Sequence, residues 1–175
     1  MGSIIKVNEY KDFNNNAIMT SDGSGNVTVN APGLQNTPAF QAQRSAVQSI
    51  ANSTFTKVQN NVVLFDTDSA YDNSTNYRFT IPSGKAGKYV FGVQCNIHDL
   101  TDTSYAYALI YKNGSKLKEN IVSASRTIPT SVTTITIDDA SVGDYYEAYT
   151  KQVSGGSLDL NYIYGNVFYG YRIIT

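Results

Sequence analysis

The sequence predicts an all-β fold, either an antiparallel sandwich or a barrel. From about residue 37 onward, roughly ten short runs alternate apolar and polar residues, and turn-forming residues separate the runs. The chain has 14 tyrosines, no tryptophan and 13 glycines, which is typical of strands joined by polar loops. Residues 43–52 carry a short helical pattern, which we interpret as a loop with about one helical turn.

Residues 77–97 contain the clearest pair of strands. Tyrosine, phenylalanine and isoleucine alternate with polar residues over 77–81, so one face of this strand is apolar. Proline and glycine over 82–87 form a turn, and the alternation resumes over 89–97. This pattern predicts two half-buried strands joined by a turn.

The rest of the chain repeats this pattern with shorter strands. Asn113 and Gly114 lie between two strand patterns and form the strongest hairpin signal in the chain. Residues 66–76 are predicted to form a long polar loop. The other predicted strands are 39–42, 55–58, 62–65, 104–111, 121–125, 131–137, 145–149, 158–160 and 167–174.

Residues 1–36 differ from the rest of the chain and are predicted to form a separate leader. Short strands are expected at 4–7, 17–20 and 27–29, and a proline-containing linker is expected at 31–38. The leader is too short and too polar to bury a core of its own. We therefore predict that it docks or oligomerises on a partner surface, either copies of itself or another protein. A loosely attached tail is the alternative.

Charge and targeting signals exclude several classes of function. The net charge is −1 with no basic patch, which argues against nucleic-acid binding. No apolar run approaches the length of a membrane span. Residues 1–6 lack the apolar region of a secretory signal, so the sequence predicts synthesis in a cytoplasm.

The residues that could support catalysis are few. Cys95 is the only cysteine, so no intrachain disulfide can form, and it lies on the apolar side of a predicted strand. His98 is the only histidine, and residues three apart in a strand face opposite sides. We therefore predict a buried structural thiol, no catalytic residues and no enzymatic activity.

A series of landmarks, in a fixed order along residues 38–174, resembles one family. The landmarks are Pro38–Ala42, Phe55, Val58, Phe65, Asp66, Phe79, Thr80, Pro82, Gly87–Phe91, Lys112–Gly114, Gly143, Asp144 and Phe168–Tyr171. In this order they resemble the globular head domain of complement subcomponent one-q, a branch of the tumour necrosis factor-like jelly rolls.

The resemblance implies that residues 37–175 form an antiparallel ten-stranded jelly-roll sandwich that assembles as a compact homotrimer. Tyrosine suits such an interface because it combines a large apolar face with a polar tip. Placement in the core, or scattered on the surface, is the alternative for most of the tyrosines. The candidates for the trimer interface are Phe40, Tyr105, Tyr107, Tyr145, Tyr149, Phe168 and Tyr171.

Calcium is the one cofactor that the sequence and the resemblance raise. Asp66, Asp68 and Asp72 are candidate ligands, because Ca²⁺ prefers oxygen ligands and some members of the family bind it near the top of the trimer. Solvated aspartates in a polar loop are the interpretation that the sequence favours.

The leader carries a second resemblance. Ile5–Asn8 and Thr20–Thr28 resemble leaders on structural proteins of marine bacteriophages, and the chain has no collagen-like stalk. This implies a trimeric virion protein, either a capsid decoration or a fibre or tail-tip protein that contacts the host surface. Residues 1–36 would bind a phage capsid or tail protein. The alternative is a secreted ligand or lectin-like module that binds a receptor or glycan through loops such as 66–76 and 99–104.

Overall fold

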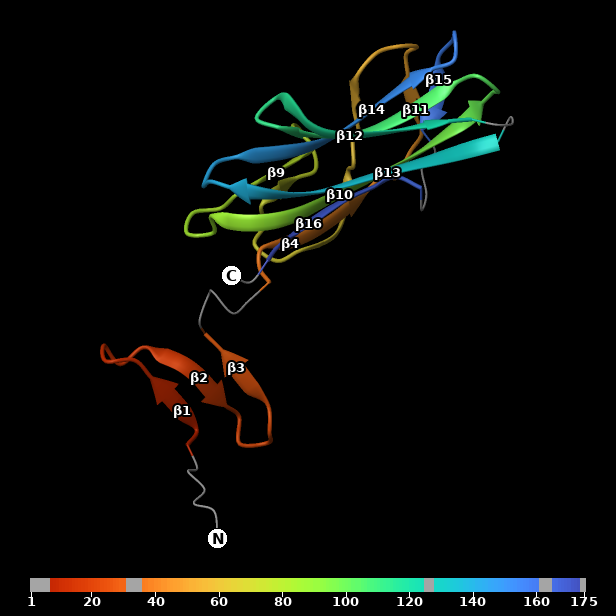
Figure 1. Ribbon diagram of the computed structural model, residues 1–175. Coiled ribbons are helices and arrows are strands. Elements are labelled where there is room, and N and C mark those ends of the chain that lie inside the picture. Colours follow the sequence, from red (N-terminus) through yellow and green to blue (C-terminus); the bar gives the residue numbers. More distant parts are fainter. Residues whose placement is uncertain (1–6, 31–35, 125–127, 161–164, 174–175) are drawn as a thin grey trace. The chain divides into compact units, whose positions relative to one another are not determined.

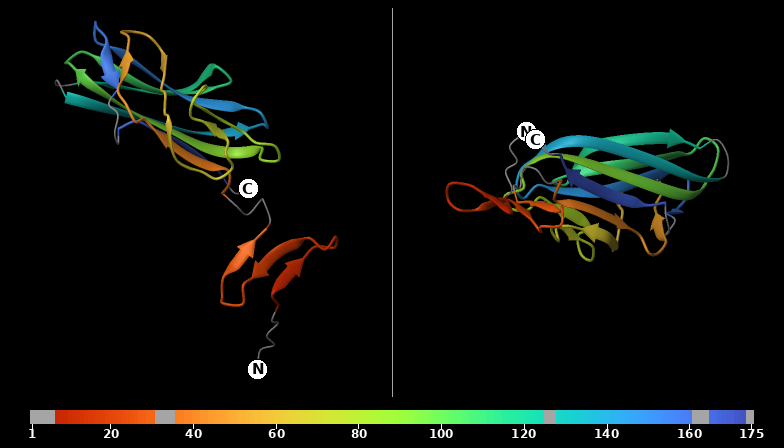
Figure 2. Two further views of the ribbon diagram at one scale, coloured as in Figure 1. Left: turned by 180° about the vertical axis from the view of Figure 1, so that it is seen from behind. Right: turned by 90° about the horizontal axis from the view of Figure 1, so that it is seen from below.

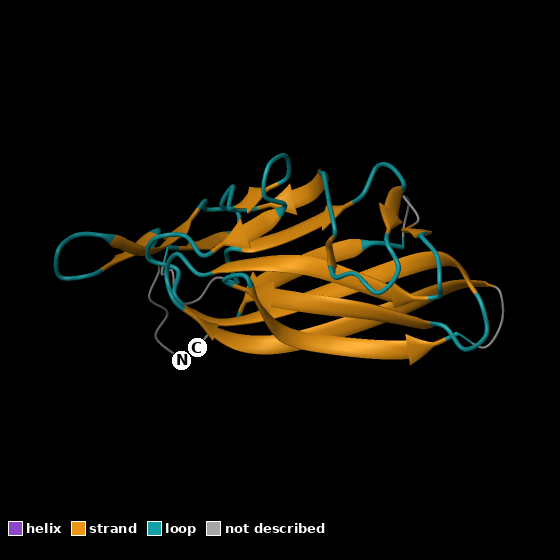
Figure 3. Cartoon of the chain, turned by 90° about the horizontal axis from the view of Figure 1, so that it is seen from above, coloured by secondary structure: helices purple, strands orange, loops and turns teal. Residues whose placement is uncertain are grey.

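The computed structural model of the 175-residue chain describes residues 7–30, 36–124, 128–160 and 165–173. The chain divides into two compact units, the leader up to Asn36 and a head formed by Thr37–Ile173. Every regular element among the described residues is a strand (Figure 3). The predicted strand residues at 4–6, the linker at 31–35 and the predicted strand ends at 125 and 174 lie outside the described residues.

The leader is a small antiparallel sheet of three strands in the order β1-β2-β3. The strands are β1 (Glu9–Lys11), β2 (Ala17–Ser21) and β3 (Val27–Val29). Both connecting turns have the same construction. In each turn the carboxylate of an aspartate, Asp12 or Asp22, accepts hydrogen bonds from the backbone N–H and the side-chain amide of the asparagine four residues later. These turns explain why such short strands keep their register.

The head is a sandwich of two antiparallel sheets, which lie face to face in Figures 1 and 2. The β10 sheet contains β4 (Ala39–Gln43), β5 (Gln48–Ile50), β7 (Val62–Asp66), β10 (Gly87–Leu100), β13 (Ile128–Ala140), β15 (Leu158–Leu160) and β16 (Val167–Arg172). The β11 sheet contains β6 (Thr56–Lys57), β8 (Tyr71–Asp72), β9 (Arg78–Thr80), β11 (Tyr105–Lys112), β12 (Ser115–Ser123) and β14 (Tyr145–Val153).

Successive strands of the head repeatedly cross from one sheet to the other. β9 lies in the β11 sheet, β10 in its own sheet, β11 and β12 in the β11 sheet, and β13 again beside β10. This arrangement confirms the predicted antiparallel jelly-roll sandwich.

Two strands occur where the sequence predicts loops. The segment 43–52 contains β5, and the polar loop 66–76 contains β8. The buried guanidinium group of Arg44 holds the first segment: it donates to the carbonyl of Ala46, the side chain of Gln48 at 2.6 Å and the carbonyl of Gln59 at 2.9 Å. Hydrogen bonds of a single side chain, one of them to Gln59 fifteen residues away, leave no periodic pattern in the sequence.

The predicted Asn-Gly hairpin is present and meets a second landmark of the head. Asn113 and Gly114 have positive φ values of 52° and 77°, as a tight hairpin between β11 and β12 requires. The side-chain amide of Asn113 donates to Asp144 at 2.8 Å, and the ammonium group of Lys112 lies 3.0 Å from the same carboxylate. The Lys112–Gly114 and Gly143–Asp144 landmarks therefore stabilise each other at one end of the head.

The core between the two sheets is dominated by stacked aromatic rings. Phe40 from the β10 sheet stacks on Phe79 from the β11 sheet, with ring centroids 4.4 Å apart. Phe91 stacks on Tyr146 across the same gap at 3.8 Å. Beside stacking energy, each ring buries a large apolar area, so these contacts contribute much of the stability of the head. The complete set of rings is Phe40, Tyr71, Phe79, Tyr89, Phe91, Tyr146 and Phe168.

Gly170 gives this aromatic core the space that it needs. It lies on β16 opposite Phe91 and Phe40 in register. A Cβ atom at this position would lie 2.6 Å from the Phe91 ring and 2.9 Å from the Phe40 ring. Even one methyl group would therefore overlap two rings that are themselves closely packed.

We predict that Gly170→Ala lowers the free energy of unfolding by about 1–3 kcal/mol, because the added methyl group overpacks the core. Chemical denaturation of the full chain measures this change. Gly156→Ala is the matched control, because its Cβ atom would meet no atom within 4 Å. Equal stabilities of the two variants would contradict this role of Gly170 in the core.

Candidate interaction surfaces

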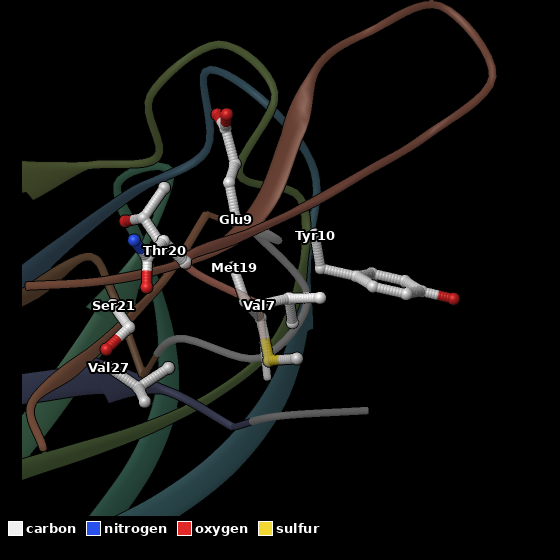
Figure 4. Close-up of a pocket in the computed structure, with 8 residues that line it drawn as sticks. Val7, Glu9, Tyr10, Met19, Thr20, Ser21 and Val27 are labelled. Atoms are coloured by element: carbon white, nitrogen blue, oxygen red, sulfur yellow. The ribbon is translucent and has the colours of Figure 1, made fainter. Parts of the chain in front are cut away.

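The first candidate surface is the apolar side of the leader sheet. Tyr10, Met19 and Val29 are paired in register across the three strands and therefore share one face. A groove of about 180 Å³ is lined by Val7, Tyr10, Met19 and Val27 together with the polar residues Asn8, Glu9, Thr20 and Ser21, and Tyr10 extends outward from it (Figure 4). Tyr10 is 57% exposed and Val27 is 60% exposed. The opposite face is polar, with Glu9 and two threonines in register.

The second candidate surface is the outward side of the β10 sheet, which we call the uncharged face. Because Phe91 and Val93 point into the core, Val90, Gly92 and Gln94 point outward. Across the middle of the sheet, the outward positions carry no charged side chain. They are Ala39, Gln41, Gln43, Val62, Phe65, Val90, Gly92, Gln94, Asn96, Ser131, Thr133, Ile135, Ile137, Val167, Tyr169 and Tyr171.

Charged residues border the uncharged face at one end. Lys88 on β10 and Asp139 on β13 follow the same alternation outward, and they are paired in register. The two residues have opposite signs, so this border carries no net charge.

The uncharged face is most apolar on β13 and β16. Ile135 and Ile137 are 52% and 64% exposed and flank Gly92 and Val90 in register. The ring of Tyr169 lies across β10 where Gly92 has no side chain, and a Cβ atom at Gly92 would overlap this ring. The glycine therefore lets a tyrosine cover the middle of the sheet.

The third candidate surface is the outward side of the β11 sheet, which we call the aromatic–cation face. The ammonium group of Lys151 lies 4.8 Å from the ring centroid of Phe55 and 5.3 Å from that of Tyr107. The guanidinium group of Arg78 lies 4.4 Å from the ring centroid of Tyr145. Such contacts between cations and ring faces are attractive. The face consists of Phe55, Lys57, Arg78, Tyr105, Tyr107, Tyr111, Lys116, Tyr145, Glu147, Tyr149 and Lys151.

One ion pair on the aromatic–cation face is largely buried. The Glu147 side chain is 4% exposed, and the Lys57 ammonium group lies 2.5 Å from its carboxylate. Lys57 is the only cation that the structure pairs with this carboxylate among the described residues. A carboxylate so far from water is stable only while a cation satisfies it.

The predicted trimer-interface residues lie in three different places. Tyr105, Tyr107, Tyr145 and Tyr149 lie together on the aromatic–cation face. Tyr171 lies apart from them, on the uncharged face and 40% exposed.

Phe40 and Phe168 require a correction. Both are fully buried within a single chain, where their rings meet at 4.9 Å. They have no surface left for a second copy, so the structure assigns them to the core. An apolar residue in an alternating strand can face the core or an interface, and the pattern does not distinguish the two.

Sequence reasoning missed the residues that make the uncharged face apolar. Phe65 and Tyr169 were landmarks of the resemblance but not interface candidates, and Ile135 and Ile137 were not singled out within their strand. The available signal was the absence of charged residues at the outward positions. This signal becomes visible only when the outward positions of five adjacent strands are considered together.

The two residues considered for catalysis are separated. Cys95 is fully buried, and burial raises the pKa of its thiol to about 12. His98 lies on the opposite side of β10, as the strand geometry predicts. A thiol with so high a pKa is almost entirely protonated at neutral pH and is a poor nucleophile.

The three candidate calcium ligands have separate partners. Asp66 accepts a hydrogen bond from the backbone of Tyr71 at 2.7 Å, and Asp68 pairs with Lys85 at 3.3 Å. The backbone N–H groups of Thr75 and Ser74 hold the pKa of the Asp72 carboxyl well below its usual range. Within the described ranges, no group of three or more His, Cys, Asp or Glu residues could hold a metal ion. A calcium site at these aspartates stays a prediction.

Comparisons with known proteins identify the fold of the head. No family model and no curated protein matches the sequence. Among solved structures, the globular domain of zebrafish complement 1qA protein has a TM-score of 0.54 at 17% identity, covering 78% of this chain and 97% of that chain. Murine APRIL at pH 5.0 has a TM-score of 0.58 at 14% identity, covering 77% and 98%.

A third similar structure is the Eiger TNF from S. frugiperda, with a TM-score of 0.55 at 12% identity, covering 79% of this chain and 94% of that chain. These identities are low, so the similarity shows the fold alone: the head is a jelly roll of the complement 1q and tumour necrosis factor type. No helix long and apolar enough to span a membrane occurs among the described residues.

We predict that Lys57→Met lowers the free energy of unfolding by about 2–3 kcal/mol, because it leaves the buried Glu147 carboxylate without its cation. Lys57→Met/Glu147→Gln should recover part of this loss. Chemical denaturation measures both variants. Lys116→Met is the control, because Lys116 and Glu119 form an exposed pair at 2.9 Å, which is worth about 0.5 kcal/mol or less. A Lys57→Met variant as stable as the control would contradict the prediction.

Proposed function

We propose that this chain is a non-enzymatic, homotrimeric virion protein of a bacteriophage. The heads of three copies pack through the uncharged face, and the leaders attach the trimer to a capsid or tail protein. The head then projects from the particle as a capsid decoration or as a fibre or tail-tip protein, with contact to the host surface in the latter role.

The observation that carries this proposal is the uncharged face. The cores of protein interfaces are depleted in charged residues and enriched in aromatic ones. An outward sheet surface with exposed isoleucines and tyrosines but no charged side chain meets this description. Gln41, Gln43 and Gln94 on the same face offer side-chain amides that can form hydrogen bonds between copies.

The leader supports the attachment role. It has an exposed apolar groove and no buried residue among those described. A sheet of this size needs a further surface to bury its apolar side, which the particle or the leaders of the neighbouring copies can supply. The resemblance of its sequence to phage leaders supports a virion as the setting.

The absence of enzymatic activity is part of the proposal. The buried thiol of Cys95 and the separation of Cys95 from His98 support it. The arrangement of the described side chains suggests binding surfaces instead.

A secreted ligand or lectin-like recognition module is the second candidate function. The aromatic–cation face favours it, because rings and cations exposed together can contact a receptor or glycan. Under this alternative, the trimer would form in the same way and the leader would not bind a particle.

We predict that the full chain has a molar mass of about three times 19.1 kDa by light scattering at neutral pH. Ile137→Glu should weaken the assembly about 100-fold or more, because it buries an unpaired carboxylate at the uncharged face. Ile121→Glu is the matched control: Ile121 is 46% exposed but lies on β12, in the other sheet. The molar mass of a single chain for the unchanged protein would contradict the proposed interface. Dissociation of the trimer by Ile121→Glu but not by Ile137→Glu would contradict it as well.

The virion role is tested by quantitative mass spectrometry of purified particles of the phage that encodes the chain. We expect the protein to remain with the particles, and its ratio to the major capsid protein distinguishes the two positions. Hundreds of copies per particle indicate decoration, and a few trimers indicate a fibre or tail tip. Its absence from particles, together with its recovery outside cells, would overturn the proposal and favour the secreted module.

A further inference from the structure

We propose that the three leaders of one trimer pack against each other through their apolar faces and so form a second oligomerisation unit in addition to the heads. This inference rests on the proposed trimer and deepens it by naming the partner of the leader groove as the same groove of the neighbouring copies. The polar side of each leader sheet then remains exposed, and it is the side available to the particle.

The leader sheet does not bury its own apolar residues. Every described residue of the leader is exposed or half-buried, including Tyr10, Met19 and Val27. Three strands with a hydrophobic face are about the smallest sheet that can be stable alone, and a unit of this size buries little surface of its own. A surface that covers the apolar side would therefore stabilise this unit.

The composition of the two sides fits packing between identical copies. By register, the apolar side carries Tyr10, Met19, Val27 and Val29. The opposite side carries Glu9, Thr20 and Thr28. On β1, the carboxylate of Glu9 lies 3.1 Å from the ammonium group of Lys11, so this strand brings no net charge to the contact. The other carboxylates of the described leader, Asp12 and Asp22, lie in the two connecting turns, where each accepts hydrogen bonds from an asparagine.

The tether to the head favours copies of the same chain over any other occupant. The leader sheet ends at Val29 and the first strand of the head begins at Ala39, so nine residues connect them. A connection of this length spans at most about 30 Å. In a trimer of heads, this confinement gives each leader an effective concentration of its two neighbours in the millimolar range. A separate partner must bind at its own, lower concentration.

Disulfide trapping in the full chain tests this contact. Met19→Cys places a thiol on the apolar side. Val27→Cys is a separate single variant with its thiol on the same side, and it serves in case Met19→Cys perturbs β2. Thr20→Cys is the matched control, since it lies next to Met19 in sequence and on the opposite side. The native Cys95 is fully buried and stays outside the reaction.

After mild oxidation, we expect covalent dimers from Met19→Cys and from Val27→Cys. Up to about two of every three chains can be linked, because one disulfide joins two chains of a trimer and leaves the third thiol without a partner. The yield should not change on dilution, because the thiols meet within one trimer. Thr20→Cys should give only background dimer.

The contact is overturned if samples with the molar mass of a trimer give no more dimer from Met19→Cys and Val27→Cys than from Thr20→Cys. In that case the proposed trimer of heads stands and only the leader contact fails. A one-chain molar mass before oxidation overturns both, because the tethering then has no trimer to act in.

Discussion

The aromatic core is the constraint on which the rest of the head depends. Rings from β4 and β10 stack on rings from β9 and β14, so the two sheets are held together by large, closely fitted side chains. A strand alternates its side chains between two faces, and a shift by one residue would exchange them all. Because Phe91 points inward, Val90, Gly92 and Gln94 must point outward. The core therefore determines the composition of both outer surfaces.

The two outer surfaces of the head differ in character as a result. The side of the β10 sheet combines Ile135, Ile137 and Tyr171 with uncharged polar residues, while the side of the β11 sheet interleaves aromatic rings with lysine and arginine. The first composition favours contact between copies, since it avoids the cost of removing charges from water. The second carries lysine and arginine, which would lose their hydration in a contact between copies, and it therefore suits a surface that remains exposed. This difference is the physical basis for the proposed function.

Much of the fold could be predicted from the sequence, because its signals are local. The alternation over 89–97 and the Asn113–Gly114 hairpin both report the geometry of a few neighbouring residues, and both predictions are confirmed. β12 was predicted to begin near Ile121 but begins at Ser115. As an edge strand it carries polar residues on both sides, which removes the alternating pattern.

The surfaces were harder to predict, because they depend on which strands become neighbours. Phe40 and Phe168 were candidates for an interface and proved to be core residues. The uncharged face combines positions from β7 to β13 that are far apart in sequence.

A structure of the full-length assembly, solved by crystallography or electron cryomicroscopy, tests the central claim most directly. We expect three copies around a three-fold axis, with Ile135, Ile137 and Tyr171 of each head buried against a neighbour and Tyr107 and Lys151 still exposed to solvent. An assembly that leaves the uncharged face in solvent, or one that buries the aromatic–cation face in its place, would contradict the proposed trimer.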